Sequence, residues 1–403
     1  MTLRKLLRGA GVGVGPALRP QPWAQDLIAR AWRRRPDPIA VGTWAAKAVD
    51  PRSPVKAITF QDIETLAYED APDPELVDPG DAIVEVSVAG VCGSDLHPYF
   101  GRERGLDVGT VMGHEFVGRV VEVGAGVTEF AVGARVVAPF TTNCGACFFC
   151  QRGLTARCVH GQLFGWVENG LGLHGGQADL VRVPHADATL AHVPDAIEDD
   201  ALGLLAGDIL STAMFGAEMA DVQDGDLVVV IGCGPVGVLA VRAALERGAR
   251  EVVAVDRVPS RLALAERFGA TPADFERGDP LAIVHELSEG RGADKAIEAV
   301  GTPQATRAAV DLLRLGGSLA ALGVHTEEHL AVSPGEIYDR NLRYAGGRCS
   351  ARHFLPRALE LTQRDAVLLS ELISHRLPLS DGIEGYRMFA AREEGCTKVV
   401  LTP

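Results

Sequence analysis

Four cysteines lie close together in the chain, at a spacing that suits a tetrahedral metal ion. They form the pattern Cys-x2-Cys-x2-Cys-x7-Cys and are Cys144, Cys147, Cys150 and Cys158. Zinc binds four thiolates in this way, and a site in which protein fills all four positions is structural rather than catalytic. Buried or disulfide-linked cysteines are the alternative, which such crowding disfavours in a chain of this length. The pattern therefore predicts a structural zinc.

A second set of candidate metal ligands is spread along the sequence. Cys92 and His114 precede the glycine-rich segment described next, and Asp208 stands at the start of an otherwise apolar helical stretch. Taken singly, each has a simpler explanation: a small core residue for Cys92, a satisfied polar group for His114, and a helix cap for Asp208. Together they supply sulfur, nitrogen and oxygen donors, and we predict that they bind a second zinc.

A glycine-rich turn follows a short apolar run and opens a helical stretch. Its residues are Gly232, Cys233, Gly234, Pro235, Val236 and Gly237. In a strand–turn–helix, the first glycine permits the tight turn, the second lets the backbone approach a pyrophosphate, and the third lets the helix meet the strand. The N-terminus of the helix adds N–H groups and a positive dipole for the phosphates. The segment predicts a dinucleotide site.

The choice of dinucleotide follows from the end of the next predicted strand. Asp256 lies 19 residues beyond Gly237. A carboxylate at that place accepts hydrogen bonds from the ribose hydroxyls and repels a 2′-phosphate. We therefore predict NAD rather than NADP, although Arg257 beside the carboxylate leaves room for dual use.

Two kinds of domain must position these groups. Residues 83–88 and 115–123 alternate as strands do, with glycine-punctuated turns, so the first part of the chain is β-rich. From residue 199 the pattern becomes α/β, and repeating strand–helix units imply a doubly wound parallel sheet. Strands are expected at 227–231, 251–256, 295–300, 318–324 and 398–401, and helices at 236–247, 260–268 and 354–362.

Charge and hydropathy limit the possible partners. The net charge of −14 makes nucleic acid and anionic membranes poor partners, and no apolar run reaches the roughly 18 residues of a membrane span. Residues 1–54 differ, because they hold ten basic and three acidic residues and leave −21 on the remainder. We expect them to be a poorly ordered basic arm rather than a transit peptide.

The motifs together resemble the zinc-containing medium-chain dehydrogenase/reductase family, which includes the alcohol dehydrogenases. The resemblance covers nearly all of residues 55–403 and is carried by the runs Cys92–His97 and Gly113–Glu115, the four-cysteine segment and the glycine-rich turn. It is strongest to the formaldehyde-dehydrogenase-like and threonine-dehydrogenase-like branch, because the chain reads Asp-Ile-Leu-Ser-Thr at 208–212.

The resemblance implies an α/β fold with a GroES-like β-rich catalytic domain at 55–205, completed by 350–403, and a doubly wound Rossmann domain at 206–349. It implies one catalytic zinc, on Cys92, His114 and Asp208, and one structural zinc in each chain. The fourth position of the catalytic zinc would take water or the substrate oxygen. Glu115 would sit behind this metal, and Asp95 would orient His114.

The resemblance also assigns the proton relay and the cofactor contacts. Ser94 would accept the alcohol proton and pass it through the nicotinamide ribose to His97, while the hydride goes to NAD. The remaining residues expected to contact the cofactor are Thr212, Arg261, Val300, Gly323, Val324, Gly347 and Lys398. Thr212 would pack on the nicotinamide, Arg261 would lie near the adenosine ribose, and Lys398 near the pyrophosphate.

Two alternatives to this dehydrogenase stay open on the sequence. One is a catalytically silent zinc-containing homologue that acts as a binding or structural protein, and the other is a zinc-free NADPH-dependent reductase of the same fold. The expected substrate is a small alcohol, or an aldehyde as its hydrate or thiol adduct. The resemblance further implies a cytoplasmic homo-oligomer, either a tetramer or a dimer.

Overall fold

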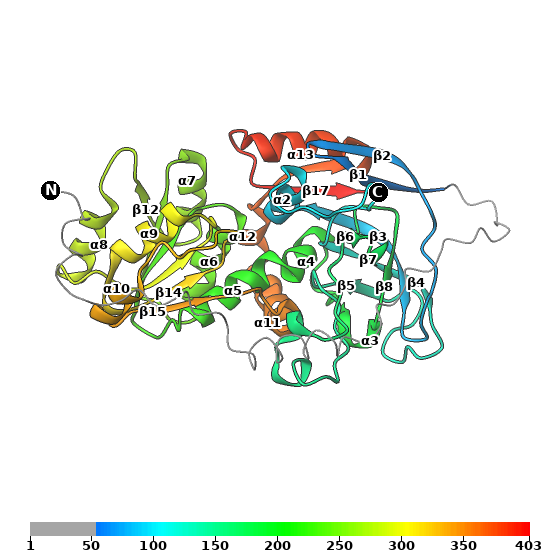
Figure 1. Ribbon diagram of the computed structural model, residues 1–403, viewed down its shortest axis with the longest axis horizontal. Helices are drawn as coiled ribbons and strands as arrows, with labels where there is room; N and C mark the ends of the chain where they lie inside the picture. Colours follow the sequence, from blue (N-terminus) through cyan, green and yellow to red (C-terminus); the bar gives the residue numbers. More distant parts are fainter. Residues whose placement is uncertain (1–53) are drawn as a thin grey trace, which may run out of the picture. The chain divides into compact units, whose positions relative to one another are not determined.

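The protein is described here by a computed structural model that places residues 54–403. The basic arm expected at 1–54 therefore lies outside the described residues, apart from Pro54. The described part is built on two large sheets, one parallel and one mixed, joined by three helices (Figure 1). The predicted domain limits stay predictions, but the strands of the two sheets fall within the segments that the prediction assigned to each domain.

The parallel sheet has the strand order of a dinucleotide-binding fold. Read across the sheet, its strands are β12 (Thr271–Asp274), β11 (Glu251–Asp256), β10 (Leu227–Ile231), β13 (Ala293–Glu298), β14 (Leu313–Ala321) and β15 (Arg343–Gly346). All five pairings are parallel. The order reverses between β10 and β13, and ligands of such sheets bind in the crevice at the carboxyl ends of the strands there.

Helices cover both faces of this sheet, and five of them begin with proline at the first helical position, where the missing N–H costs nothing. They are α6 (Pro235–Glu246), α7 (Pro259–Arg267), α8 (Pro280–Ser288), α9 (Pro303–Leu312) and α10 (Pro334–Asp339). α6 and α7 pack on one face, and α8 and α9 on the other. All five residues of β10 are buried, as expected of a strand covered on both sides.

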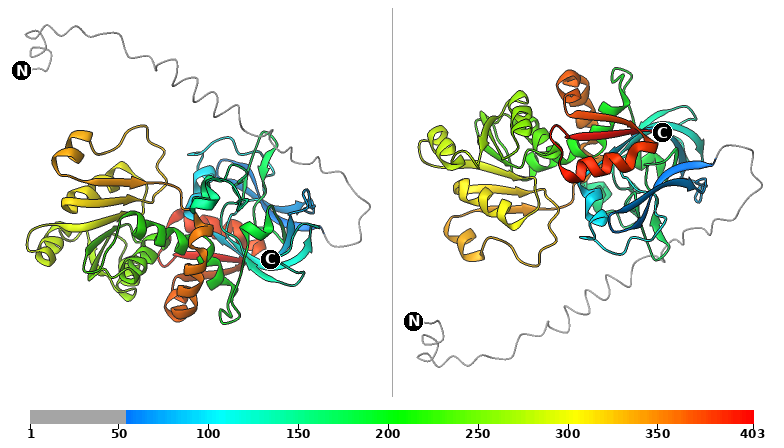
Figure 2. Two further views of the ribbon diagram at one scale, coloured as in Figure 1. Left: turned by 90° about the horizontal axis from the view of Figure 1, so that it is seen from below. Right: turned by 90° about the horizontal axis from the view of Figure 1, so that it is seen from above.

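The mixed sheet combines strands from both ends of the described chain. Its order is β16 (Ile373–Pro378), β17 (Lys398–Thr402), β3 (Ala82–Val91), β4 (Phe116–Val123), β5 (Arg135–Val137) and β9 (Ala191–His192), and β8 (Leu180–Val183) also pairs with β3. Figure 2 shows the red C-terminal strands beside the blue and cyan ones. The chain thus returns from the parallel sheet to complete the first domain.

Shorter elements surround the mixed sheet. The hairpin β1 (Val55–Asp62) with β2 (Thr65–Ala71), and the pair β6 (Trp166–Glu168) with β7 (Leu171–Leu173), form two small sheets. Short helical turns are η2 (Gly93–Asp95), α2 (Leu96–Tyr99), η3 (Cys150–Arg152), η4 (Thr155–Arg157) and α3 (Ala186–Thr189). Near the C-terminus lie α12 (Ala366–Ser370), η5 (Leu379–Asp381) and α13 (Gly382–Ala391).

Three packed helices connect the two sheets: α4 (Asp200–Gly207), α5 (Ile209–Met219) and α11 (Ala351–Arg364). Their buried side chains belong to the same core as those of β10 and α6. Within the described residues, one stretch, Asp200–Met219, has the length and apolar composition of a membrane-crossing helix, but 72% of its apolar 18-residue segment is buried inside the protein. Such burial is what a core helix shows.

Candidate functional site

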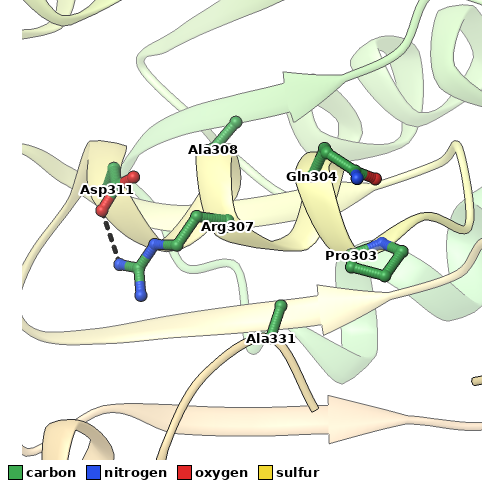
Figure 3. Close-up of a pocket in the computed structure, with 6 residues that line it drawn as sticks. All are labelled: Pro303, Gln304, Arg307, Ala308, Asp311 and Ala331. Atoms are coloured by element: carbon green, nitrogen blue, oxygen red, sulfur yellow. Dashed lines mark hydrogen bonds and ion pairs between the residues drawn. The ribbon is translucent and has the colours of Figure 1, made fainter. Parts of the chain in front are cut away.

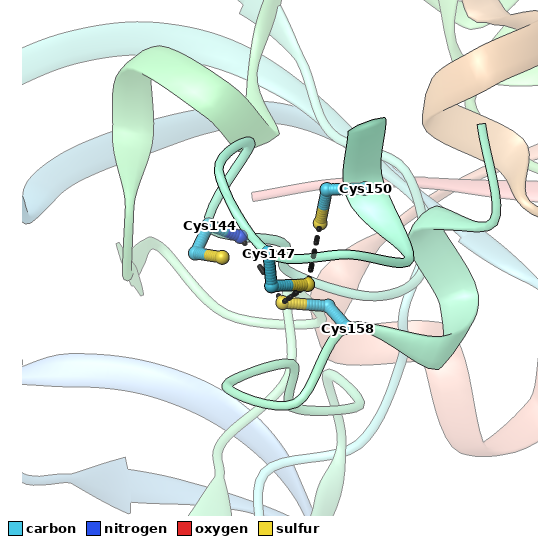
Figure 4. Close-up of side chains that lie close together, drawn as sticks. All are labelled: Cys144, Cys147, Cys150 and Cys158. Carbon is cyan, nitrogen blue, oxygen red and sulfur yellow. Dashed lines mark hydrogen bonds between the residues drawn. The ribbon is translucent and has the colours of Figure 1, made fainter. Parts of the chain in front are cut away.

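The four clustered cysteines point into one small space (Figure 4). The sulfur of Cys147 lies 3.5 Å from that of Cys150 and 3.9 Å from that of Cys158. All four sulfurs lie within 4.8 Å of one another. Zn–S bonds of 2.3 Å in a tetrahedron put sulfurs about 3.8 Å apart, whereas a disulfide needs about 2.05 Å. The donor set therefore fits a tetrahedral zinc and not disulfides.

Local backbone geometry gathers these cysteines. Gly145 and Gly153 adopt positive φ angles of 69° and 73°, which turn the chain between successive ligands. The backbone N–H of Cys144 donates to the sulfur of Cys158 at 3.2 Å. Burial raises the pKa of the Cys147 thiol, but N–H groups of neighbouring residues outweigh burial and bring that pKa to about 6. These N–H groups therefore favour the thiolate of Cys147, the form that binds metal.

Cys92, His114 and Asp208 also converge, although 116 residues separate the first from the last. The sulfur of Cys92 lies 3.4 Å from Oδ2 of Asp208, and Nε2 of His114 lies 3.3 Å from the same oxygen. A tetrahedral zinc with ordinary bond lengths separates sulfur from oxygen by about 3.6 Å and nitrogen from oxygen by about 3.4 Å. The three donors therefore fit one zinc ion with a fourth position left for another ligand.

The fold explains why these three side chains meet. Cys92 follows β3, and His114 precedes β4, the antiparallel neighbour of β3. Asp208 sits at the break between α4 and α5, with φ −134° and ψ −79°. Its side chain makes no capping hydrogen bond, so the helix-cap explanation does not apply. The break instead turns the carboxylate toward Cys92 and His114.

Asp95 and Ser94 surround this cluster. Oδ1 of Asp95 lies 3.0 Å from Nδ1 of His114, and Oδ2 accepts from the backbone N–H of Cys92 at 2.9 Å. The Asp95 carboxylate thus contacts both His114 and the backbone of Cys92, which fits the orienting role that the resemblance gave it. Oγ of Ser94 lies 3.1 Å from Nε2 of His114 and 3.2 Å from the sulfur of Cys92, on the metal-binding side of both groups.

The charges of the cluster call for a cation. Burial lowers the pKa of His114, but the carboxylates of Asp95 and Asp208 outweigh burial and hold that pKa well above its usual value. Two buried carboxylates beside a thiol are stable only with positive charge between them. A divalent metal ion held by Cys92, His114 and Asp208 would supply that charge and would take the place of the imidazole proton.

Lys398 is the site residue whose contacts differ most from expectation. The resemblance placed it near the cofactor pyrophosphate, but its ammonium is buried, pairs with Oε2 of Glu115 and donates to the carbonyl of Val91 at 3.1 Å. The reason is topological, because β17 lies against β3 and points Lys398 into the layer behind His114. Glu115 does lie behind the cluster, and its Oε1 is buried without a hydrogen-bond partner.

His97 lies on α2, one short turn beyond Ser94. Burial lowers the pKa of its half-buried imidazole, and its Nδ1 has no hydrogen-bond partner. Among the described residues, Ser94 and His97 share no hydrogen bond. A proton passing between them therefore needs an intermediate group, as the resemblance expected of the nicotinamide ribose.

The glycine-rich turn has the shape of a dinucleotide cradle. Gly232 follows β10 with φ +88°. A Cβ on Gly234 would meet nothing within 4 Å, whereas a Cβ on Gly237 would lie 1.7 Å from the carbonyl oxygen of Gly232. The turn thus has a tight bend, an open face and a close helix–strand contact, which are the three properties that a pyrophosphate site needs.

Asp256 at the end of β11 is tied to this turn. Its Oδ2 accepts from the backbone N–H of Cys233 at 2.7 Å, and its Oδ1 accepts from the N–H groups of Arg257 and Val258 at 2.7 and 3.0 Å. The guanidinium of Arg257 is turned to Glu276 at 3.4 Å. Among the described residues, Arg261 makes no side-chain hydrogen bond or ion pair. These contacts are compatible with either dinucleotide.

The expected nicotinamide contacts lie on adjoining loops beyond β13 and β14. A Cβ on Gly323 would lie 2.0 Å from the nitrogen of Gly301, so the two loops touch. Val300 and Val324 are 46% and 40% exposed and offer uncovered apolar surface at the crevice. Gly347 lies in the next segment, where a Cβ would be 3.8 Å from the ring of Phe215. Thr212 donates to Oδ1 of Asp208 at 3.0 Å and connects the cluster to α5.

The structure adds Glu298, which the sequence analysis did not single out. Its fully buried carboxylate accepts from the backbone N–H groups of Val300 and Gly301, both at 2.7 Å, and lies 3.0 Å from Nε2 of His325. It therefore ties the first of these loops to the second. An acidic residue inside the strand expected at 295–300 was the available signal; in the structure that strand ends at Glu298.

A second missed pair supports the metal-binding loops from behind. Nε2 of Gln177 donates to the carbonyl of Gly90, and Oε1 of Gln177 accepts from the hydroxyl of Tyr386, both at 2.9 Å. The side chain of Gln177 also packs under Gly113, where a Cβ would be only 2.4 Å from it. Tyr386 belongs to α13, so a helix near the C-terminus holds the loops of Cys92 and His114.

A surface hollow of about 400 Å³ lies elsewhere, on the outer side of α9 (Figure 3). Its lining residues are Pro303, Gln304, Arg307, Ala308, Asp311 and Ala331. None of them is a predicted site residue, and Arg307 is already paired with Glu336 and Asp311. The hollow is not part of the site described above.

Comparison with known proteins agrees with this geometry. Two protein-family models match the chain: "Alcohol dehydrogenase GroES-like domain" over residues 78–195 and "Zinc-binding dehydrogenase" over residues 235–364. The chain is 41% identical over 346 residues to "Zinc-type alcohol dehydrogenase B" of Aspergillus flavus, a match that covers 84% of this chain and 79% of the relative.

Solved structures agree as well. The alcohol dehydrogenase TADH from Thermus sp. ATN1 matches with a TM-score of 0.81 and 34% identity, over 86% of this chain and 99% of that one. A zinc-binding dehydrogenase from Sinorhizobium meliloti 1021, solved with NADP bound, matches with a TM-score of 0.77 and 29% identity, over 87% of this chain and all of the other. The chain belongs to the zinc-dependent medium-chain alcohol dehydrogenase family and is a zinc-dependent oxidoreductase with a GroES-like and a Rossmann-type domain.

Proposed function

We propose that the protein is an NAD-dependent dehydrogenase that oxidises an alcohol, or an aldehyde in its hydrated or thiol-adduct form. The observation that carries this proposal is the convergence of Cys92, His114 and Asp208 on one point, with Ser94 beside them. A closed four-ligand site would be structural, whereas three ligands leave a position for a substrate oxygen. The separate four-cysteine site then holds the structural zinc.

The residues around the cluster have distinct tasks in this reaction. When bound, zinc polarises the substrate oxygen, and the nicotinamide exchanges hydride with the carbon that bears it. Asp95 holds His114 in one orientation, and the Glu115–Lys398 pair lies behind the ligands. Ser94 accepts the substrate proton at Oγ. The Ser94 hydroxyl passes a proton on through an intermediate group to His97, whose pKa burial lowers, and His97 releases it to solvent.

The preference for NAD rests on Asp256. A carboxylate at the end of β11 is unfavourable for a 2′-phosphate, because it would place two anions side by side. Arg257, 58% exposed and paired with Glu276, is the residue through which NADP would be tolerated, and the Sinorhizobium relative was solved with NADP. We therefore propose NAD as the better substrate, with NADP turned over more slowly.

The expected branch of the family and the expected oligomeric state are also part of this proposal. The formaldehyde-dehydrogenase-like branch is supported by the carboxylate ligand Asp208 and the Thr212 that follows it. A homo-oligomer is proposed from the family resemblance alone, and light scattering of the purified protein would measure it. A catalytically silent homologue is disfavoured because ligands, relay hydroxyl, histidine and cofactor cradle all stand together.

The test is a substrate panel read by the absorbance of the reduced nicotinamide. Simple alcohols, a polyol, threonine, and formaldehyde with and without glutathione are offered with NAD or NADP. We expect turnover that is faster with NAD, and two zinc ions per chain by metal analysis. Asp208→Ala should abolish turnover and leave one zinc, because it removes a ligand of only one site.

The matched control is Asp221→Asn, which alters a surface carboxylate paired with Arg343 and should leave both zinc ions and the turnover unchanged. No turnover of any member of the panel by the zinc-loaded protein would favour the silent homologue. Full activity in Asp208→Ala would show that the cluster is not the catalytic site.

A further inference from the structure

The segment that follows β15 packs beside the candidate catalytic site. Cys349 in this segment is 4% exposed and packs with Phe140 and Phe354. The ring of Phe140 meets the ring of His114 edge-on, with centroids 6.3 Å apart. Asp208 also lies close enough to raise the pKa of the Cys349 thiol, after burial itself. The segment therefore passes directly beside the metal-binding cluster.

Arg348 stands next to Cys349, where three segments of the catalytic domain meet. The backbone N–H of Ala156, in η4, donates to Oγ of Ser350 at 3.3 Å, which brings Arg157 alongside. Glu103 faces Arg348 from the third segment. The N–H of Glu103 donates to the carbonyl of His97 at 3.3 Å, so this segment is the continuation of α2.

The Arg348 guanidinium has a charged environment but no partner. Burial lowers its pKa, and Arg157 adds repulsion while Glu103 opposes it. Within residues 54–403 neither Arg348 nor Arg157 makes a side-chain hydrogen bond or ion pair. Arg348 nevertheless has exposed surface. The Arg348 guanidinium is therefore a partly desolvated cation that an anionic solute can reach.

A third arginine adds to the positive charge near Arg348. Arg102 lies over the ring of Phe100, at 5.2 Å from the centroid, and repels the His97 imidazole. Arg348 thus has Arg157 and Glu103 for charged neighbours, and Arg102 lies near His97 on the same side, in a chain whose net charge is −14. Most other arginines of the described chain are satisfied within the protein, as Arg307 is by Glu336 and Asp311. Unpaired guanidinium groups are the form in which proteins bind carboxylates and phosphates.

We propose that Arg348, supported by Arg157, binds an anionic group on the substrate, so that the enzyme acts on alcohols or aldehydes that carry a carboxylate or phosphate group. The inference rests on the proposed function, since it concerns the substrate of the same site. The Arg348 guanidinium binds the anion in a bidentate manner, while the hydroxyl group of the same molecule reaches the metal cluster. Arg157 adds attraction and keeps other cations away.

The test compares rigid substrates that differ in one group. 4-(Hydroxymethyl)benzoate carries a carboxylate, 4-(hydroxymethyl)benzamide is its neutral counterpart, and 4-(hydroxymethyl)phenyl phosphate carries a phosphate. For the wild type we expect kcat/KM about 10- to 100-fold higher for an anionic substrate than for the amide, which is the range of one or two charge-assisted hydrogen bonds. The better of the two anions identifies the group.

Variants of the arginines test which residue produces the preference for an anionic substrate. Arg348→Gln should remove most of the preference by lowering kcat/KM for the anion while leaving the amide unchanged, and Arg348→Lys should keep part of it. Arg157→Gln should lower the preference by a smaller factor. The control is Arg152→Gln, because Arg152 lies on the same cysteine-rich lobe but is occupied by the ring of Phe148, 3.6 Å from its centroid.

Equilibrium binding distinguishes a failure of this inference from a failure of the proposed function. Calorimetry with 4-(hydroxymethyl)benzoate and its amide needs neither turnover nor nucleotide. A benzoate preference that Arg348→Gln abolishes supports the inference even if no oxidation is seen, in which case only the proposed function fails. Equal binding of acid and amide by the wild type overturns the inference. An increase in the KM for NAD in Arg348→Gln, equal for all substrates, assigns the arginine to the cofactor instead.

Discussion

Glu298→Gln tests whether the buried carboxylate between the two nicotinamide loops organises cofactor binding. Glutamine has the same shape but no charge. Oε1 of Glu298 receives two backbone N–H bonds of 2.7 Å, and Oε2 lies 3.0 Å from His325. A hydrogen bond to a charged group contributes about 1.5–3 kcal/mol and a neutral one about 0.5–1.5 kcal/mol. The substitution therefore weakens each backbone bond by about 1 kcal/mol.

Both weakened bonds hold the loop of Val300 and Gly301 in the conformation that we propose contacts the nicotinamide. If the loop becomes ordered only when the nucleotide binds, the cost of ordering it weakens binding by up to about 2 kcal/mol. This corresponds to a Kd that is higher by up to about 30-fold. We expect the Kd for NADH to rise by about 10- to 30-fold. Fluorescence titration of NADH measures it without turnover, and circular dichroism checks that the fold is intact.

The control is Glu327→Gln, because Glu327 lies 3.3 Å from the other nitrogen of His325 and its side chain is 35% exposed. A partly exposed ion pair contributes little, so its loss should change the Kd by less than about threefold. The reasoning is refuted if Glu298→Gln binds NADH as tightly as the wild type. A protein that binds no nicotinamide nucleotide at all would instead count against the proposed function.

Two further predictions concern the β-rich domain. Cys147→Ser should lower the zinc content from two to one per chain and make the cysteine-rich lobe sensitive to protease; two retained zinc ions by metal analysis would contradict a four-thiolate site. Burial, with Arg182 adding to it, lowers the pKa of His174, whose Nδ1 accepts from the N–H of Val111 at 3.1 Å. The folded protein therefore binds fewer protons at this group, and stability falls as the pH drops below about 6.5. In His174→Gln the loss of Tm between pH 7 and pH 5 should be smaller than in the wild type, and an identical loss would show that His174 does not contribute.

The sequence predicts best those features that a short local pattern of residues defines. The four cysteines and the glycine-rich turn each lie within a few residues, so spacing alone predicts their geometry. The predicted strands and helices of the parallel sheet recur in the structure with shifts at their ends; the strand expected at 318–324, for example, spans Leu313–Ala321. Gly323 lies beyond this strand, where it approaches Gly301 more closely than a side chain would permit.

Such local patterns could not predict contacts between segments that lie far apart in the sequence. Gln177 and Tyr386 are 209 residues apart, and neither stands in a motif. Lys398 was assigned to the cofactor by the family resemblance, since a cation in a terminal strand gives no local indication of its partner. Only the pairing of β17 with β3 turns this side chain toward Glu115. Glu298 and His325 likewise meet because β13 and β14 are neighbours in the sheet.

The return of the chain to its first sheet has a consequence for the order in which the two proposed zinc sites mature. The four cysteines span a short stretch and can take up metal as soon as that stretch has left the ribosome. The Glu115–Lys398 pair spans 283 residues, which take roughly 15–60 s to synthesise at the usual rates of translation. Until then Glu115 is an unpaired carboxylate, and α13 is not there to support Gln177. One site is therefore built early from neighbouring residues, whereas the other stays half-supported until nearly the whole chain is made, and it is the one most exposed to wrong metals or to proteolysis in a nascent protein.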